Sequence, residues 1–496
     1  MSGQVFLSHT GADADEVDAL ERALTDRGID VFRDRGSAPF DPVPAARRDA
    51  LDSSVLLLAF YSRRYPTRSS CQGELTRAFL SALHHGEDPG ERIVVLNPEP
   101  GAEHISPPEL AGAALPYRGP DSVPAVVDAV ATRLGYQPMG GPPEAGPGEC
   151  LPRPRRLVGR HQALWAVHHG LSTPNGVVWL RAPAGAGTTT LAERYGLLFR
   201  DAHPGGQAWT TLGGPDSGAR WAAEVSRVAR TWFGLDVTGL RPRQARAALA
   251  QRLSEAGEPV LWVVDDVPEG LDPSALDELV LPSPVVRTIL IGRSGSPGGR
   301  VAEVSLDGLT ADEVEELFAE RWPGMAEDER RAVGELAERC HGNPLLLAVA
   351  AQTVGGEKLA AFPGGLEGLL AVVRECGDHA RVVLGFASLL APVPFGGELV
   401  TEGVTEVLGV RAPMLVARAL DELDRRCLLH RVARGGHGQA WRLPAQVAEA
   451  VRRGVAAPLL DALTGRAAWL VERALAVAGD DPDLCAHARA LVANRA

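Results

Sequence analysis

Lysine is almost absent from this chain of 496 residues: Lys358 is the only one, and nearly all positive charge is carried by arginine. The formal net charge at pH 7 is −13, which argues against a protein held on nucleic acid by bulk positive charge. Aromatic residues are also scarce, at 5% of the chain against 45% hydrophobic residues overall. The abundance of Ala, Leu and Val favours helix-rich α/β packing, in roughly three domains for this length.

Cysteines are few and scattered. They form neither a C-x-x-C pair nor another metal-ligand spacing: Cys71, Cys150, Cys340, Cys376, Cys427 and Cys485. This pattern indicates buried, reduced thiols and gives no certain metal site. No apolar run approaches the ~20 residues of a membrane span, and Met1–Thr10 lacks the regions of a signal peptide. We therefore expect a cytoplasmic protein with neither a membrane nor a nucleic acid as partner.

A stretch dense in proline and glycine, Tyr136–Arg156, divides the chain and is typical of an interdomain linker. Before it, strands are expected at Gln4–His9, Gly28–Asp34, Ser53–Ser62 and Arg92–Asn97, and helices at Asp15–Arg27, Ser70–His84 and Val123–Leu134. The third strand is a nearly continuous apolar run, as in a central parallel strand that is buried on both faces. This alternation predicts a small doubly wound α/β domain.

A second α/β block follows the linker, and a helical region follows that block. Strands are expected at Gly176–Leu180, Gln207–Leu212, Pro259–Val267 and Arg287–Arg293. Helices are expected at Ala311–Arg321, Glu327–Cys340 and Pro344–Val354. The hairpin-like segment Cys427–Leu443 suits a winged helix, and the residues from Pro458 onward have a helical pattern.

The segment "RAPAGAGTTTLAERY" has the form of a phosphate-binding loop that has lost its lysine. In the pattern G-x-x-x-x-G-K-[ST], Ala182 takes the place of the first glycine and Thr188 that of the lysine, while Gly187 and Thr189 are in place. Backbone N–H groups around Gly185 and the helix start at Thr188–Thr190 would still surround a phosphate. The lost charge removes a contact of about 1.5–3 kcal/mol. We expect weak or absent nucleotide binding and no ATP hydrolysis.

Four segments before the linker occur in the order and spacing of a TIR domain: "VFLSHTGAD", "GIDVFRD", "LLLAFYSRRY" and "SSCQGEL". The resemblance implies a flavodoxin-like fold over residues 1–136. Some TIR domains only self-associate as adaptors. Others cleave NAD⁺ at the nicotinamide–ribose bond with a glutamate in the C-x-x-E-L stretch, which stands here as Cys71–Leu75 and places that role on Glu74.

A carboxylate near the ribose would stabilise the positive charge that develops as nicotinamide leaves, and no metal is required. Glu74 lies at the border of an apolar helix stripe, where the wall of a cleft is expected, although a solvated surface carboxylate has the same pattern. Ser8, His9, Arg33 and Asp34 end their strands and would line the same cleft as NAD-binding residues, because ligands of open α/β sheets bind at the carboxyl ends of strands.

The second block resembles the nucleotide-binding core of STAND ATPases of the NB-ARC type, through "LVGR", "VVDDV", "ILIGRS" and "CHGNPLLL". The resemblance implies ATP or ADP with Mg²⁺ as cofactor. The resemblance places further nucleotide-binding residues in four short motifs: Gly159 and Arg160, Asp265 and Asp266, Arg293, and Pro344. NB-ARC proteins also carry a Met-His-Asp triplet whose histidine touches the phosphate. Here the triplet is Leu443–Ala445, so a second phosphate contact is lost.

The expected layout is a TIR domain (1–136), a linker (137–154), an NB-ARC-like P-loop domain (155–304), a helical domain (305–372), a winged-helix-like domain (373–455) and a helical tail (456–496) that resembles a lead-in to repeats. This combination resembles immune-type, antiphage receptors. Three functions stay open: an NAD⁺-consuming effector regulated by a degenerate module, a non-enzymatic adaptor, and a STAND ATPase regulator. We expect self-association through both domains, and sensing either by a separate partner protein or by repeats beyond the helical tail.

Overall fold

The computed structural model describes residues 3–33, 45–142, 157–213, 217–293, 301–319, 322, 324–353, 359–433, 439–478 and 481–493. The chain divides into two compact units. The first consists of Met1–Gly146, Gly159–His169 and Arg194–Gly206, and the second of Pro147–Val158, Gly170–Glu193 and Gln207–Ala496. Two short stretches of the expected P-loop domain thus belong to the first unit.

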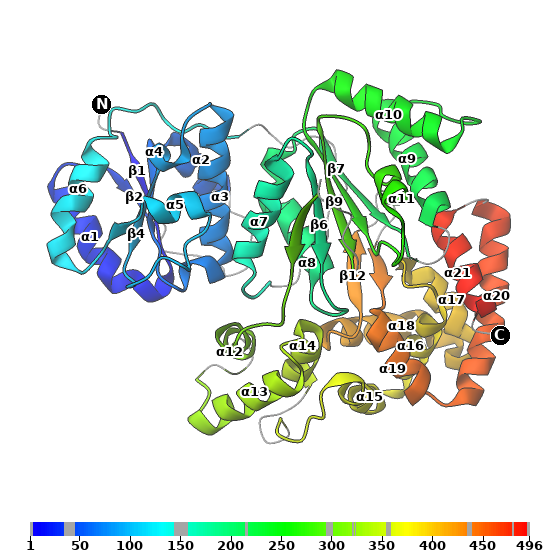
Figure 1. Ribbon diagram of the computed structural model, residues 1–496. Coiled ribbons are helices and arrows are strands. Elements are labelled where there is room, and N and C mark those ends of the chain that lie inside the picture. Colours follow the sequence, from blue (N-terminus) through cyan, green and yellow to red (C-terminus); the bar gives the residue numbers. More distant parts are fainter. Residues whose placement is uncertain are drawn as a thin grey trace. The chain divides into compact units, whose positions relative to one another are not determined.

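The first unit is built on a parallel sheet with the strand order β2-β1-β3-β4-β5 (Figure 1). The strands are β1 (Val5–Ser8), β2 (Val31–Phe32), β3 (Leu56–Phe60), β4 (Ile93–Asn97) and β5 (Leu115–Pro116). All residues of β1, β3 and β4 are buried, as the apolar runs predict for central strands. The expected flavodoxin-like order is confirmed, and β5 is an additional edge strand.

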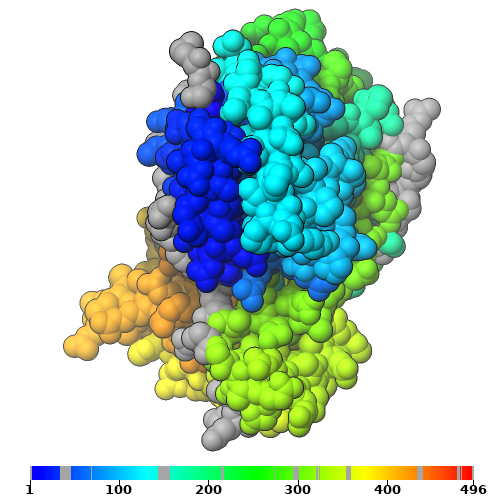
Figure 2. All heavy atoms as spheres, turned by 90° about the vertical axis from the view of Figure 1, so that its left-hand side faces the viewer, coloured from blue at the N-terminus to red at the C-terminus, as the bar shows by residue number. Residues whose placement is uncertain are grey.

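Helices cover both faces of this sheet. They are α1 (Ala14–Asp26), α2 (Ala45–Ser53), α3 (Ser69–His84), α4 (Pro89–Arg92), α5 (Pro108–Gly112) and α6 (Val123–Ala131), with short 3₁₀ turns η1 (Gly11–Asp13), η2 (Tyr65–Thr67) and η3 (Pro120–Ser122). On one side α1 and α6 lie next to each other, as the blue and cyan surfaces of Figure 2 show. Helix α1 buries Val17, Leu20 and Leu24, which share one helix face.

The other side of α3 packs on the beginning of α7 (His161–Ser172) and on residues near the turn η4 (Arg200–Ala202). Phe79 of α3 meets the ring of Trp165 edge-on at 4.8 Å, and Trp165 meets Phe199 at 5.0 Å. His168 stacks on Phe199 at 4.5 Å. Helix α3 is therefore held between the sheet and an aromatic cluster, so that most of its side chains are withdrawn from solvent.

The second unit begins with another parallel sheet, in the order β10-β6-β9-β8-β7. The strands are β6 (Val177–Arg181), β7 (Gly206–Thr211), β8 (Val260–Asp265), β9 (Val286–Gly292) and β10 (Ala302–Ser305), and the helices are α8 (Thr188–Leu198), α9 (Ser217–Phe233), α10 (Pro242–Ala256) and α11 (Pro273–Glu278). Strand β9 lies between β6, which leads into the phosphate-binding loop, and β8, which ends at Asp265. The expected P-loop α/β fold is confirmed, with β10 as an added edge strand.

A continuous hydrophobic core from Val314 to Leu491 joins the helical region, the winged helix and the last two helices. The helices are α12 (Ala311–Ala319), α13 (Glu327–Arg339), α14 (Pro344–Thr353), α15 (Gly365–Glu375), α16 (Asp378–Leu389), α17 (Gly397–Leu408), the 3₁₀ turn η6 (Gly409–Arg411), α18 (Ala412–Arg425), α19 (Ala445–Gly454), α20 (Ala457–Ala478) and α21 (Pro482–Ala493). The antiparallel strands β11 (Phe395–Gly396), β13 (Gln439–Arg442) and β12 (His430–Ala433) form the wing. Among the described residues, no helix has the length and apolar content that crossing a bilayer requires.

Candidate functional site

Glu74 lies on α3 with its carboxylate turned into the first unit, where the whole residue is 5% exposed. Ser8 Oγ at the end of β1 donates a hydrogen bond to Glu74 Oε2 at 2.5 Å. Arg47 Nη1 of α2 donates to Glu74 Oε1 at 3.1 Å. A solvated helix carboxylate, the alternative that the sequence left open, does not fit this environment. Glu74 is a buried carboxylate whose two oxygens accept hydrogen bonds from Ser8 and Arg47.

Tyr65 adds a further hydrogen bond behind Ser8, because its hydroxyl lies 2.8 Å from Ser8 Oγ. Ser8 has a single hydroxyl proton and gives it to Glu74, so Tyr65 must be the donor in its bond with Ser8. Burial raises the pKa of Tyr65 well above its usual range, and the charge of Glu74 adds to this shift. Tyr65 therefore keeps its proton, and the chain Tyr65–Ser8–Glu74 holds the carboxylate in one orientation.

His9 and Arg33, which were expected to line one cleft, contact each other beside this chain, and their binding of NAD⁺ stays a prediction. Arg33 Nη2 lies 3.0 Å from His9 Nε2, and a guanidinium can only donate, so Nε2 is the acceptor. Burial and then the charge of Arg33 lower the pKa of His9, which is therefore neutral at neutral pH. Arg33 is also anchored on α1 by ion pairs with Asp18 and Glu21. Asp34, the fourth residue expected here, lies outside the described residues.

Cys71 and Asp13 lie at the same edge of the sheet, and both are engaged in hydrogen bonds. Burial, followed by the charge of Glu74, raises the pKa of the Cys71 thiol, whose Sγ donates to the carbonyl of His9 at 3.4 Å. Cys71 is thus a poor nucleophile. Asp13 accepts hydrogen bonds from Thr10 at 2.7 Å and Ser62 at 2.8 Å. The carboxyl edge of β1 and β3 therefore presents fixed polar groups, of which Glu74 is the buried carboxylate.

The phosphate-binding loop of the second unit retains part of its expected geometry. Gly185 and Gly187 have the left-handed φ values of 78° and 92° that favour glycine. Ala182 is buried and is not among the residues with positive φ, so alanine causes no backbone strain there. Thr188 and Thr190 are half-buried in the first turn of α8. Between them, Thr189 Oγ1 lies 3.2 Å from each carboxylate oxygen of Asp265.

Arg442, at the end of β13 in the wing, also binds Asp265, and its Nη1 lies 2.5 Å from Oδ2. The two side chains are 17% and 3% exposed. Burial by itself would lower the pKa of Arg442, but the charge and hydrogen bond of Asp265 raise it above its usual value. Arg442 directly precedes the triplet Leu443–Ala445, and no sequence motif marks it.

The remaining predicted residues are distributed around this centre. Arg293 reaches Asp266 at 4.0 Å, and burial together with the charge of Asp265 raises the pKa of Asp266. Pro344 is the first residue of α14, but its neighbour Asn343 makes the contact with the phosphate-binding loop, from Nδ2 to the carbonyl of Ala184 at 2.9 Å. Gly159 and Arg160 precede α7 in the first unit, each with a φ of 63°.

The two groups that a Mg²⁺ ion would need at this loop are engaged with other residues of the chain. The metal would need the Thr189 hydroxyl and the Asp265 carboxylate as ligands, yet both already bind each other, and a guanidinium lies on Asp265. The chain offers no lysine at residue 188 for a phosphate. Among the described residues, no cluster of three or more His, Cys, Asp or Glu side chains could hold a metal ion.

Comparison with known families decides the identity of the first unit. Residues 5–118 match the family model of the TIR domain. This part of the chain is a TIR domain. Its strand order and the position of its C-x-x-E-L stretch agree with the resemblance seen in the sequence. A comparison with curated proteins gives no match.

Solved structures similar to the chain include three archaeal proteins. A STAND protein with a tetratricopeptide repeat sensor from Pyrococcus horikoshii is 17% identical, with a TM-score of 0.48, over 66% of this chain and 46% of that one. Cdc6p from Pyrobaculum aerophilum is 14% identical, with a TM-score of 0.31, over 63% and 95%. The ORC2 protein of Aeropyrum pernix in its ADP form is 13% identical, with a TM-score of 0.33, over 64% and 96%. The chain spans less than half of the first protein, and at these identities the likeness concerns the fold alone.

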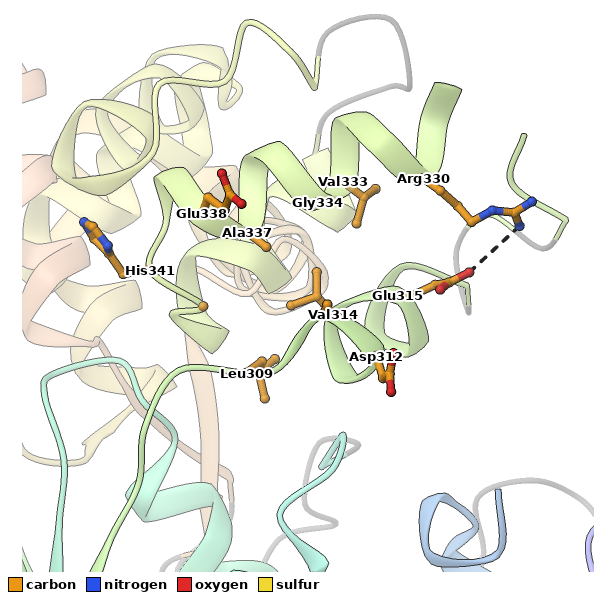
Figure 3. A pocket seen from close by; sticks show the side chains of 12 residues that line it. Leu309, Asp312, Val314, Glu315, Arg330, Val333, Gly334, Ala337, Glu338 and His341 are labelled. Atoms are coloured by element: carbon orange, nitrogen blue, oxygen red, sulfur yellow. Dashed lines mark ion pairs between the residues drawn. The ribbon is translucent and has the colours of Figure 1, made fainter. Parts of the chain in front are cut away.

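A pocket of about 580 Å³ lies between α12 and α13 and extends to Gly342, the residue before Asn343. Figure 3 shows its acidic rim, in which Arg330 points toward Glu315 at 3.9 Å, and its apolar floor at Val314 and Val333. It contains none of the predicted site residues, so the TIR site around Glu74 and the centre at Asp265 remain the two candidates.

Proposed function

We propose that the TIR domain hydrolyses NAD⁺ at the nicotinamide–ribose bond, with Glu74 as the catalytic carboxylate. The observation that carries this proposal is the buried position of Glu74 at the carboxyl edge of the sheet, with one oxygen bound by Ser8 and the other by Arg47. A carboxylate without a role is seldom kept charged in such a place, since burial of a charge is costly. Buried carboxylates at the carboxyl edge of an open α/β sheet are candidates for functional sites, because ligands bind at this edge.

The reaction needs little beyond this carboxylate. As the bond between nicotinamide and ribose breaks, the sugar carbon gains positive charge, which Glu74 stabilises while Tyr65 and Ser8 keep it in place. Water then adds to that carbon and gives ADP-ribose and a proton. Arg47 must leave Glu74 for the ribose to enter. The pyrophosphate of NAD⁺ is suited to draw it away, because a guanidinium binds phosphate oxygens in pairs.

Nicotinamide release from NAD⁺ by the full chain tests the proposal. Glu74→Gln keeps an oxygen that accepts the hydrogen bond from Ser8 and removes the charge, so we expect the rate to fall by about 100-fold or more. Glu103→Gln changes an exposed glutamate of the same domain and should leave the rate unchanged. A Glu74→Gln protein with wild-type activity would show that the carboxylate is not catalytic.

A second candidate is a non-enzymatic adaptor that signals by self-association. One observation favours it: both oxygens of Glu74 are already occupied by groups of the chain. The two candidates give different results when sedimentation and NAD⁺ loss are followed over the same range of protein concentration. Assembly that is accompanied by NAD⁺ loss supports the enzyme, and assembly at constant NAD⁺ supports the adaptor.

We assign the second unit a regulatory role, in immune-type signalling within the cytoplasm. Its fold is that of a nucleotide module, while Thr188 and the triplet Leu443–Ala445 lack the groups that contact phosphate. Control by a separate sensor protein that changes self-association suits such a module better than control by ATP hydrolysis. Mixing the chain with ATP and Mg²⁺ should therefore leave its sedimentation coefficient unchanged.

A further inference from the structure

Asp265 is among the most deeply buried charges of the second unit, and its counter-ion comes from another part of that unit. The carboxylate ends β8 with a side chain that is 3% exposed, and Arg442 reaches it from β13, 177 residues further along the chain. Asp266 N–H donates to Oδ1 at 2.9 Å, and the Thr189 hydroxyl lies within reach of both oxygens. No ligand from outside is needed to balance this charge.

Besides the ion pair between Arg442 and Asp265, the winged helix makes a second polar contact, with the phosphate-binding loop. Gln446, in the first turn of α19, donates from Nε2 to the carbonyl of Ala184 in the phosphate-binding loop at 3.2 Å. Arg442 and Gln446 lie on either side of the triplet Leu443–Ala445. The wing thus retains two polar contacts with the phosphate-binding loop and Asp265, although the triplet itself has lost its polar side chains.

The helical region adds contacts at the same loop. Asn343 is the cap of α14, because its Oδ1 accepts from the N–H groups of Leu345 and Leu346 at 3.1 and 3.2 Å. Its Nδ2 donates to the Ala184 carbonyl, and Leu345 N–H donates to the Gly185 carbonyl at 3.1 Å. A Cβ atom at Gly185 would lie 2.7 Å from Gln446 Oε1 and 2.8 Å from Asn343 Oδ1. The loop is therefore held closely from two sides.

We propose that Arg442 is the resident cation of Asp265, and that this ion pair closes the winged helix onto the phosphate-binding loop without nucleotide or metal. Removing one partner of a buried ion pair leaves the other charge uncompensated, which is strongly destabilising. The closed arrangement therefore depends on Arg442. A guanidinium keeps its charge at all physiological pH values, so the closure persists until a conformational change separates β13 from β8.

Amide hydrogen exchange of the full chain tests this proposal. In Arg442→Gln we expect exchange to rise about tenfold or more in peptides covering residues 182–193 and 439–447, because the local opening that permits exchange becomes less costly. Peptides of α16, whose residues lie in the continuous core, should keep their wild-type rates. Arg453→Gln is the matched control, since Arg453 pairs with Glu449 on the surface of α19 with 60% and 47% exposure.

Asp265→Asn provides a second variant that removes the other partner. It should raise exchange in the same peptides, and Arg442→Gln combined with Asp265→Asn should raise it no further than either single change. Two results would overturn the proposal. The first is wild-type exchange in both peptides of a folded Arg442→Gln protein. The second is a wild-type protein whose residues 182–193 gain more than about tenfold protection from millimolar Mg·ADP.

Discussion

The ion pair between Arg47 and Glu74 leads to a quantitative prediction for the stability of the TIR domain. Its side chains are 7% and 6% exposed, and the charged atoms lie 3.1 Å apart. Removing one partner of a buried pair costs about 3–5 kcal/mol, because the remaining charge stays buried. An exposed pair is worth about 0–1 kcal/mol. The loss of unfolding free energy on breaking the pair therefore shows whether Glu74 is buried or exposed.

The perturbations are Arg47→Gln, Glu74→Gln and the two together. We expect each single change to lower the free energy of unfolding by about 3 kcal/mol. The double variant should lose about the same amount as either single variant, since it leaves no buried charge behind. The interaction energy is then about 2–3 kcal/mol in favour of the pair. For a unit of this size, each single change should lower the melting temperature by about 10 °C.

Urea unfolding followed by circular dichroism measures these four proteins under one condition. Arg63 and Glu99 provide the control cycle in the same domain, with 69% and 27% exposure and a distance of 3.6 Å. Their interaction energy should stay below about 1 kcal/mol. A cycle at Arg47 and Glu74 that gives no more than the control pair would refute the buried carboxylate, and with it the structural basis for the proposed catalysis.

Three further predictions follow from the described contacts. Burial, with a smaller contribution from His169, lowers the pKa of His168 from 6.5 to about 3, so at pH 5 the unfolded chain binds a proton that the folded chain does not. Unfolding free energy should fall by about 2 kcal/mol between pH 7.5 and pH 5 by this effect, and His168→Gln should reduce the drop in a melting series. Because burial raises the pKa of the Cys71 thiol, Cys71→Ala should retain NAD⁺ cleavage, and a thiol reagent should label Cys71 more slowly than the less buried Cys427, as peptide mass spectrometry would show. Thr188→Lys alone should not bind Mg·ADP in calorimetry, since Arg442 still lies on Asp265, whereas Thr188→Lys with Arg442→Gln should bind it.

Much of the fold could be predicted because buried parallel strands have a recognisable pattern. The runs that became β3, β4, β8 and β9 are apolar and continuous, and burial on both faces requires this. The strands that were missed, β5, β10 and β11, are short edge strands with few buried residues. Helix α2 was missed because it directly follows a proline-rich stretch of sequence.

The acidic residues of both sites could be predicted, and their arginine partners could not. Glu74 and Asp265 stand in short patterns whose spacing is distinctive. The chain has 50 basic residues, nearly all of them arginine, and no local pattern distinguishes Arg47 and Arg442 among them. Only the tertiary fold brings these two side chains to a carboxylate. The same holds for Gln446 and Asn343, whose contacts depend on how α19 and α14 meet the phosphate-binding loop. Local patterns give no information about such distant pairs.

Both candidate sites therefore follow one physical rule. In each, a buried carboxylate is neutralised by an arginine from a different element: Glu74 of α3 by Arg47 of α2, and Asp265 of β8 by Arg442 of β13. Arginine suits this role because its planar guanidinium holds its charge and binds carboxylate oxygens with little loss of entropy. Such a pair does not open by loss of the guanidinium proton within the physiological pH range, and buried pairs are only weakly screened by salt. What opens them must compete for one partner or move the element that carries it. The pyrophosphate of the proposed substrate can compete for Arg47, whereas in the proposed closure Arg442 leaves Asp265 when the wing moves.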